Sequence, residues 1–411
     1  MDRRDSDSTD RRRAGFWQRR FMSPTLGIQL VTIASSGDPE TNDEESFMRS
    51  MTRFATAAVG AVLLSTTLLA PPVLAANDGN DSNDSNDPGQ TTGNGHQGNA
   101  SGFSFGVIGD VPYGDAEIQA FPSYIQDLNA HKELSFVAHV GDIKNGSSQC
   151  TDQYFEAIKK DFDSFTAPLV YTPGDNEWTD CHRSNNGAYN PLERLAKIRE
   201  LFFPKPGFTL GAPMKVKSQA KEGFPENVRF RRHEVAFTAV NIPGSNNSML
   251  PWTGLGQTQP TAAQLNEVQQ RTRADIEELK DTFRTAQNNG DRAVVVMTQA
   301  DMFDPTVAAP SQADFGAFKA LVQTVIEESN SFSGPVYLIN GDSHVYNQDH
   351  PLAAGSAWLS FYGQATAAKN LTRVTVDGSN NAKDWLKVTV NPEDSASVMS
   401  FDRIPFMHPA S

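Results

Sequence analysis

The chain has 411 residues and carries 49 Asp and Glu against 35 Lys and Arg, which gives a formal net charge of −14. This length allows one large domain or two ordinary ones. The acidic balance argues against a nucleic-acid-binding protein, because there is no basic excess to neutralise phosphates.

Residues 48–76 have the pattern of a secretory signal peptide. Arg49 and Arg53 form a positive segment, residues 54–70 are apolar, and residues 73–75 offer an A-x-A-like cleavage pattern. An uncleaved membrane anchor is the alternative, but the apolar run is short and two prolines end it. We therefore expect cleavage and a secreted or periplasmic protein without a stable membrane anchor.

The segments on either side of this signal are not expected to fold. Residues 1–47 precede it, so we expect the true start at Met48 or Met51 and a misassigned or non-structural extension before it. Residues 77–102 consist largely of Asn, Asp, Gly, Ser and Gln. Such a segment buries too little apolar surface to offset its ordering entropy and is predicted to be a disordered linker.

Four short apolar runs in the expected domain, residues 103–391, each end in Gly-Asp. The pairs are Gly109-Asp110, Gly141-Asp142, Gly174-Asp175 and Gly341-Asp342. Runs that are apolar throughout and rich in β-branched or aromatic residues are typical of strands buried on both faces. The glycine permits a tight exit, and the Asp then stands at the carboxyl end of its strand, where open α/β sheets bind ligands.

A single Asp at this position can equally be the N-cap of the following helix. Four copies, with a related run at 293–297 that leads to Gln299, favour a shared site instead. Converging carboxylates would repel one another, so we expect divalent metal between them.

Helical patterns alternate with these runs. Asn190-Pro191 and the pair Thr261 and Gln264 are N-terminal capping signals, and Gly290 is a stop signal. The region 230–242 alternates in polarity like a half-buried strand.

The end of the chain carries two alternating runs, 371–376 and 385–390, which read as a hairpin. We therefore expect an α/β fold in which a βα half is joined to an antiparallel edge or second sheet. Residues 392–411 are expected to be a loose tail.

The two cysteines of the chain, Cys150 and Cys181, each follow a Gly-Asp loop. Behind a signal peptide they could form one disulfide. If adjacent strands carry those loops, the bridge would hold two ligand loops together. Two unpaired thiols are the alternative.

The order of these segments resembles the calcineurin-like metallophosphoesterase superfamily over roughly residues 103–391. That family is a two-sheet αβ sandwich, with mixed sheets flanked by helices, whose strand-end loops hold two metal ions. Its usual motifs are D-x-H, G-D-x-x, G-N-H-D/E, a lone His after a strand, and G-H-x-H. The resemblance implies hydrolysis of a phosphate ester, either a small molecule or a polymer.

The sequence keeps some family positions and changes others. The matching positions are Asp110, Asp142, which is the Asp that bridges both metals, and His344. The changed positions are Pro112 and Gln299, each at a His of the family, Asp175 at its ligand Asn, Asn176 at its catalytic His, and Asp342 at the first His of the last motif. The resemblance thus implies metal ligands at Asp110, Asp142, Asp175, Gln299, Asp342 and His344.

Oxygen donors replace imidazole at several of these positions, and oxygen-rich sites prefer hard cations. We therefore expect two divalent ions, with Mg²⁺, Mn²⁺ or Ca²⁺ favoured and iron or zinc as alternatives. The lost ligands could also leave one metal position weak or empty.

Hydrolysis normally uses a general acid, and Asn176 at the catalytic position cannot supply a proton. His182 and Tyr113 are the candidates to replace it. Arg183 is a candidate phosphate clamp, and Asn247 a candidate for lining the pocket. An ordinary loop role is the alternative for each.

Three functions therefore remain open from the sequence. The first is an exported metal-dependent phosphoesterase. The second is a catalytically degenerate relative that binds metal or a phosphorylated ligand without turnover. The third is a structural protein in which the aspartates only cap helices.

Overall fold

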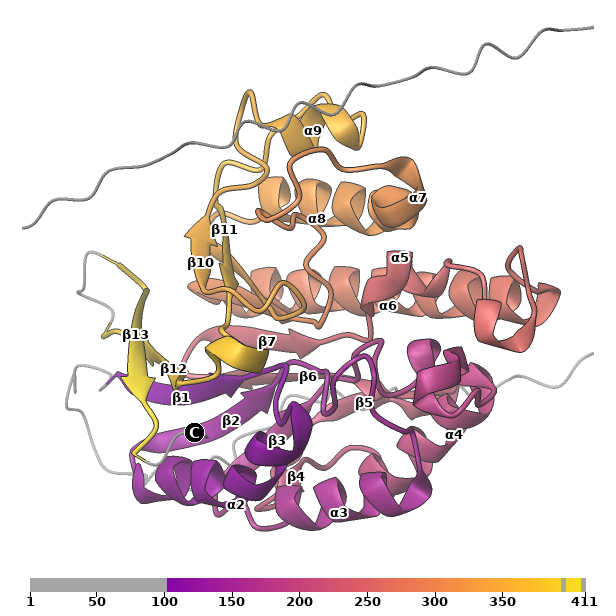
Figure 1. The fold of residues 1–411 in the computed structure, drawn as a ribbon. Helices are drawn as coiled ribbons and strands as arrows, with labels where there is room; N and C mark the ends of the chain where they lie inside the picture. The colour runs from indigo at the N-terminus through magenta and orange to yellow at the C-terminus, as the bar shows by residue number, and fades with distance from the viewer. Residues whose placement is uncertain (1–101, 393–396, 408–411) are drawn as a thin grey trace, which may run out of the picture. The chain divides into compact units, whose positions relative to one another are not determined.

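Two mixed β-sheets stacked face to face form the centre of the described structure, and helices cover both outer faces (Figure 1). The computed structural model describes residues 102–392 and 397–407. The predicted segments 1–47 and 48–76, and all but the end of 77–102, lie outside the described residues.

The first sheet has six strands in the order β13-β12-β1-β2-β3-β4. β1, β2 and β3 are parallel, whereas β4, β12 and β13 run antiparallel to their neighbours. The strands are β1 (Phe103–Ile108), β2 (Leu134–His139), β3 (Pro168–Tyr171), β4 (Leu210–Gly211), β12 (Asp384–Val390) and β13 (Met399–Pro405).

The second sheet has seven strands in the order β10-β11-β9-β8-β7-β6-β5. β7, β8, β9 and β11 are parallel, and the two edges are antiparallel. The strands are β5 (Lys217–Gln219), β6 (Phe224–Arg232), β7 (Val235–Ala239), β8 (Ala293–Met297), β9 (Val336–Asn340), β10 (Asn347–Asp349) and β11 (Leu371–Thr375).

Helices pack on the outer face of each sheet (Figure 1). Those on the first sheet are α2 (Gly114–Ala130), α3 (Asp152–Phe162) and α4 (Pro191–Phe202). Those on the second are α6 (Ala262–Asn289), α8 (Lys319–Ser331) and α9 (Ala357–Phe361), while α5 (Gly244–Ser248) and α7 (Gln312–Phe315) are short. In the part of the chain that is described, no helix combines the length and apolar character needed to span a bilayer.

The capping signals act as predicted. The Asn190 side chain accepts from the Leu192 amide, and Thr261 and Gln264 form a capping box at the start of α6. Gly290 ends α6 in the left-handed conformation.

The core explains why the central strands are apolar on both faces. Phe105 of β1 points between the sheets, where its ring meets that of Phe237 at 5.5 Å. Ile108 of the same strand packs outward under α2. The predicted α/β class, a two-sheet sandwich of mixed sheets flanked by helices, is confirmed.

Three local predictions are wrong. Residues 371–376 and 385–390 do not form a hairpin, because β11 pairs with β9 and β10 in the second sheet while β12 pairs with β1 and β13 in the first. Part of the predicted tail, Met399–Pro405, is the edge strand β13. The region 230–242 holds two strands rather than one, since His233 and Glu234 take left-handed backbone (φ 44° and 59°) and turn β6 into β7.

Candidate metal centre

Aspartates from both sheets meet at the carboxyl ends of the parallel strands. β1, β2 and β3 lead to Asp110, Asp142 and Asp175, and β9 leads to Asp342. Two triads have ligand atoms within 4.8 Å of one another, Asp110–Asp142–His344 and Asp142–Asp175–Asp342. Asp142 belongs to both triads, so the predicted convergence of four distant carboxylates is present.

Four of these residues have an unusual backbone. Asp110, Asp142, Asp342 and His344 have φ of 53°, 59°, 73° and 61°. A left-handed conformation costs a non-glycine residue on the order of 1 kcal/mol or more and persists only where the surroundings enforce it. The strain turns each side chain out of the strand direction and into the shared site.

The glycine before each aspartate has a different purpose from the predicted one at two positions. A Cβ on Gly174 would lie 2.1 Å from Asp142 Oδ1, and one on Gly341 would lie 2.2 Å from Asp110 Oδ2. Neither glycine has a positive φ. The absence of a side chain is therefore required by the approach of the neighbouring aspartate, not by a tight turn.

None of the three loop aspartates of the first sheet is a helix N-cap. The residue before α2 is Tyr113, without a side-chain cap, and Thr151 caps α3. The capping alternative therefore does not account for Asp110, Asp142 or Asp175.

The cluster is electrostatically unfavourable when it holds only protein. Burial raises the pKa of Asp110, Asp142 and Asp342 above the ordinary range, and the neighbouring aspartates raise each further. A bound cation would reverse the sign of these effects, because it stabilises the ionised carboxylates.

Two basic groups offset part of this charge. His344 Nε2 lies 3.2 Å from Asp110 Oδ1; burial lowers its pKa, but the contact with Asp110 and the other carboxylates outweighs burial, so the pKa is raised. Lys144 is fully buried and donates to the carbonyl oxygens of Asn145 (2.8 Å) and Asn176 (2.9 Å). Burial lowers the pKa of Lys144 to about 8.

The Asp175 corner is held by residues of the second sheet. Gln299 Nε2 donates to Asp175 Oδ1 at 3.2 Å, while its amide oxygen accepts from the Gly244 N–H at 2.6 Å. Gln299 thus lies beside the cluster as predicted and orients Asp175. Its amide oxygen retains one further lone pair, so a ligand role stays a prediction.

Ser245 connects Asp175 to a further carboxyl group. Its Oγ lies 2.9 Å from Asp175 Oδ2 and 2.7 Å from Asp180 Oδ1. One hydroxyl carries one proton, so the second contact requires a protonated acid. Burial, with the charge of Asp175, raises the pKa of Asp180 to about 8, a direction that agrees with Asp180 as the acid that shares its proton.

Tyr113 and Asn176 lie directly on Asp142. The Tyr113 hydroxyl donates to Asp142 Oδ2 at 2.8 Å and accepts from Asn176 Nδ2 at 2.9 Å. Asn176 Nδ2 also donates to Asp142 Oδ2 at 2.7 Å. Burial and the charge of Asp142 raise the pKa of Tyr113 well above its usual value, so the phenol is a hydrogen-bond donor in this state.

The other loop candidates differ in outcome. Arg183 pairs with Asp180 at 2.5 Å and its side chain is 39% exposed; its Nη1 and the Asn176 Oδ1 would each lie 3.1 Å from a Cβ on Gly146. Arg183 therefore stands at the rim of the site beside Asn176. His182 is buried, its Nδ1 accepts from the Gly254 N–H, and burial lowers its pKa to about 4, so it is uncharged at neutral pH.

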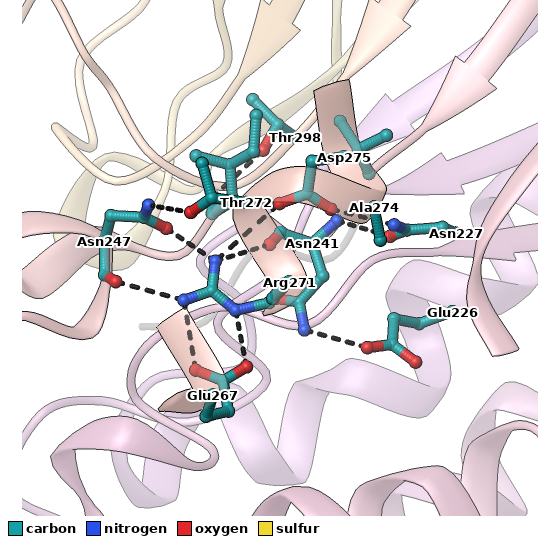
Figure 2. A network of polar contacts seen from close by, with 12 residues as sticks. Glu226, Asn227, Asn241, Asn247, Glu267, Arg271, Thr272, Ala274, Asp275 and Thr298 are labelled. Atoms are coloured by element: carbon teal, nitrogen blue, oxygen red, sulfur yellow. Dashed lines mark hydrogen bonds and ion pairs between the residues drawn. The ribbon is translucent and has the colours of Figure 1, made fainter. Parts of the chain in front are cut away.

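Asn247 is not a pocket-lining residue, contrary to the prediction. It is fully buried, its Oδ1 accepts from Arg271 and its Nδ2 donates to Thr272 Oγ1 (Figure 2). Both polar groups face α6 and the side chain has no exposed surface, so a substrate does not reach it.

The predicted disulfide between Cys150 and Cys181 is present. Both sulfurs lie 3.6 Å from the Asn176 carbonyl oxygen, which also accepts from Lys144. The bridge therefore ties the segment after Asp142 to the segment after Asp175.

Sequence reasoning missed Lys144, Ser245 and Asp180. Lys144 had a local signal, because it lies two residues after the strand-end Asp142. Ser245 and Asp180 had none, because their contact joins residues 65 positions apart.

The donor set fits a metal centre. Four aspartates and one histidine supply oxygen and imidazole ligands from four segments, in two triads whose ligand atoms lie close enough to share an ion. Glu177 reinforces the scaffold, since one of its oxygens accepts from the Asp142 and Gly174 amides.

The fold and this cluster define an α/β sandwich with a carboxylate-rich candidate metal centre. No family model and no curated protein sequence matches the chain. Among solved structures, it is similar to "GAP50 the anchor in the inner membrane complex of Plasmodium", with 10% identity, a TM-score of 0.37, and coverage of 75% of this chain and 90% of that one.

It is also similar to the purple acid phosphatase PPD1 from yellow lupin (Lupinus luteus) seeds. The identity is 12% and the TM-score 0.39, and the match covers 74% of this chain and 52% of that chain. The chain thus spans about half the length of the lupin protein.

Proposed function

We propose that the protein is an exported, metal-dependent hydrolase of phosphate esters with a carboxylate-rich dinuclear site. The observation that carries the proposal is the sharing of Asp142 by the two ligand triads. Asp110 and His344 would complete one position, and Asp175 and Asp342 the other. A divalent pair bound there would polarise the phosphoryl group and lower the pKa of a bound water.

The cations expected are Mg²⁺, Mn²⁺ or Ca²⁺ rather than iron or zinc, because oxygen donors outnumber the single imidazole. Solvent has access from the side of His344, whose side chain is 35% exposed, and Arg183. An incoming phosphate would meet the Arg183 guanidinium at this rim.

The chain's own residues would organise the reacting groups. Tyr113 and Asn176 donate to Asp142 and hold its orientation. Lys144 supplies a fixed positive charge beneath the loop that carries Asp175 and Asn176. Tyr113 is the remaining proton-donor candidate, since the pKa of His182 is about 4.

Export rests on the signal-like segment 48–76 and agrees with the disulfide, which persists in oxidising compartments. The test of activity uses protein stripped with chelator and then supplied with Mg²⁺, Mn²⁺ or Ca²⁺ and with p-nitrophenyl phosphate or its bis-ester. We expect metal-dependent release of nitrophenol that Asp142→Asn abolishes. The matched control is Asp115→Asn, an exposed aspartate in the first turn of α2. An Asp142→Asn variant as active as wild type would refute the proposal.

A second candidate is a catalytically degenerate relative that binds metal or a phosphorylated ligand without turnover. It is favoured by one observation, namely that an amide, Asn176, occupies the place of a proton donor beside Asp142. Uptake of metal and of inorganic phosphate without hydrolysis of either ester would select this candidate over the first.

A further inference from the structure

Arg271 is a fully buried arginine in the middle of α6, outside the carboxylate cluster (Figure 2). Its Nη1 donates to the Asn241 carbonyl oxygen at 3.1 Å and to Asn247 Oδ1 at 2.5 Å. Its Nη2 donates to the Asn247 carbonyl oxygen at 3.0 Å, and its Nε to Glu267 Oε1 at 2.7 Å. A single guanidinium therefore holds both ends of the segment 241–247.

That segment contains a left-handed turn, α5. Ser245, Asn246, Asn247 and Ser248 have φ of 49°, 54°, 55° and 65°. Each such residue costs on the order of 1 kcal/mol, although Asn tolerates the conformation better than most. Four in succession persist only if external contacts hold them. Arg271 supplies two of these contacts, both to Asn247, and a third to Asn241 before the turn.

This left-handed turn contacts the Asp175 half of the centre. Its first residue, Gly244, donates its N–H to Gln299 Oε1, and Ser245 donates to Asp175 Oδ2. The turn also packs closely on the carboxylates, since a Cβ on Gly244 would lie 2.8 Å from Asp175 Oδ2 and 3.0 Å from Asp342 Oδ1.

Arg271 reaches the same half by a second route. Its guanidinium lies 5.4 Å from the ring of Trp178, within range of a cation–π contact. The backbone N–H of Trp178 donates to the Asp175 carbonyl oxygen at 3.3 Å. The contacts of Arg271 thus reach Asp175 through the turn and through Trp178, whereas Asp110 lies one hydrogen bond further on, at the Asp342 amide (3.1 and 3.0 Å).

We propose that Arg271 is a positioning residue for the Asp142–Asp175–Asp342 half of the centre. It acts through the left-handed turn and sets metal affinity in that half alone. This inference rests on the proposed dinuclear site. It adds that the Asp175 half of the site is held by residues that do not hold the Asp110 half.

The test is a calorimetric titration of the chelator-stripped full chain with Mn²⁺ alone. Arg271→Lys keeps the positive charge but loses the planar fork that reaches Asn241 and Asn247 together. We expect wild type to bind two equivalents. We expect Arg271→Lys to weaken one step 10- to 100-fold, the usual effect of removing an outer support, and to leave the other unchanged.

A second variant assigns the affected step. His344→Gln removes a ligand of the Asp110 half, so its remaining step belongs to the Asp175 half. Adding Arg271→Lys to this background should weaken that remaining step by the same factor.

The matched control is Arg229→Lys. Arg229 is also buried and binds α6 through Glu278 and Asp281, but it makes no contact with the turn. It should lower thermal stability and leave both Mn²⁺ affinities unchanged.

If Arg271→Lys does not fold, Thr272→Val takes its place, because this change removes only the hydroxyl that accepts from Asn247 Nδ2. Thr272→Val should weaken the same step several-fold, with Thr282→Val on the same helix as its control.

Equal weakening of both steps, or no weakening, overturns the inference while leaving the proposed function intact. A wild-type protein that binds fewer than two equivalents also overturns it, and ester hydrolysis then decides the proposed function separately.

Discussion

The replacement of Asp142 by Asn tests the centre most directly, because Asp142 belongs to both triads. Without metal, the native pKa of Asp110, Asp142 and Asp342 is raised above the unfolded value. The native state therefore binds more protons than the unfolded chain above about pH 4, so stability falls as pH rises.

One such group that stays protonated in the native state contributes about 1.4 kcal/mol per pH unit. Between pH 5 and pH 7 it removes about 2.7 kcal/mol of unfolding free energy. Asn at position 142 cannot titrate, so the variant should lose less stability over this interval than wild type does, and about 2.7 kcal/mol is the upper limit for one titrating group. The substitution also lowers the unfolding free energy. Its side-chain NH₂ group faces the Asn176 N–H groups, which donate to Asp142 in wild type, and this mismatch costs about 1–3 kcal/mol at every pH.

With metal present, the unfolding free energy of wild type should exceed that of Asp142→Asn. A ligand present at a hundred times its dissociation constant stabilises the native state by about 2.7 kcal/mol per site. Wild type should gain this from Mn²⁺ at pH 7, and Asp142→Asn should gain little or nothing at either position.

The assay is guanidinium unfolding of chelator-treated protein at pH 5 and pH 7, with and without Mn²⁺. The reasoning is refuted if the variant keeps the wild-type pH dependence, or if Mn²⁺ stabilises both proteins equally.

Other parts of the structure give three further expectations. Tyr113→Phe removes the hydroxyl bound to Asp142 and should reduce kcat for ester hydrolysis at least 10-fold with Mn²⁺ stoichiometry unchanged; a normal kcat would exclude a proton-donor role. Joint replacement of Cys150 and Cys181 by Ala opens a loop with a sequence separation of 31 and should lower the unfolding free energy by roughly 3–4 kcal/mol, measured against untreated and reduced wild type. Arg373→Met leaves Asp301 buried without its ion pair and should lower the unfolding free energy by about 3–5 kcal/mol at pH 7. The native pKa of Asp301 is about 6 and would rise further in the variant, so this loss should shrink toward pH 5. An equal loss at both pH values would contradict this account.

The convergence of the aspartates could be predicted because strand direction fixes it. Parallel strands present their carboxyl ends at one edge, and the apolar runs before Asp110, Asp142 and Asp342 mark where each strand ends. The predicted hairpin at 371–390 failed for a related reason. Alternating polarity shows which face of a strand is buried, but it does not identify the strand with which it pairs.

The supports of the site were not predictable in the same way. Lys144, Ser245 and Arg271 act through hydrogen bonds to backbone or carboxyl oxygens on other segments. Such contacts leave no periodic pattern in the sequence. Asn247 was misread because an Asn in a polar loop was expected to be exposed, whereas four successive left-handed residues turn its side chain toward α6.

The charge of the cluster leads to a last prediction. An imidazole that binds metal gives up its proton, so in the metal-bound centre the four ionised aspartates and protonated Lys144 together carry three negative charges. One divalent cation leaves one negative charge, and a second leaves one positive charge that a phosphate anion would offset.

Inorganic phosphate should therefore tighten the weaker of the two Mn²⁺ steps and leave the stronger one nearly unchanged. Because coupling between two ligands is reciprocal, Mn²⁺ should raise phosphate affinity by the same factor. Titration of each ligand at fixed concentrations of the other measures both factors. Phosphate affinity that is independent of Mn²⁺ would mean that the anion binds at Arg183 or elsewhere, and not across the two metal positions.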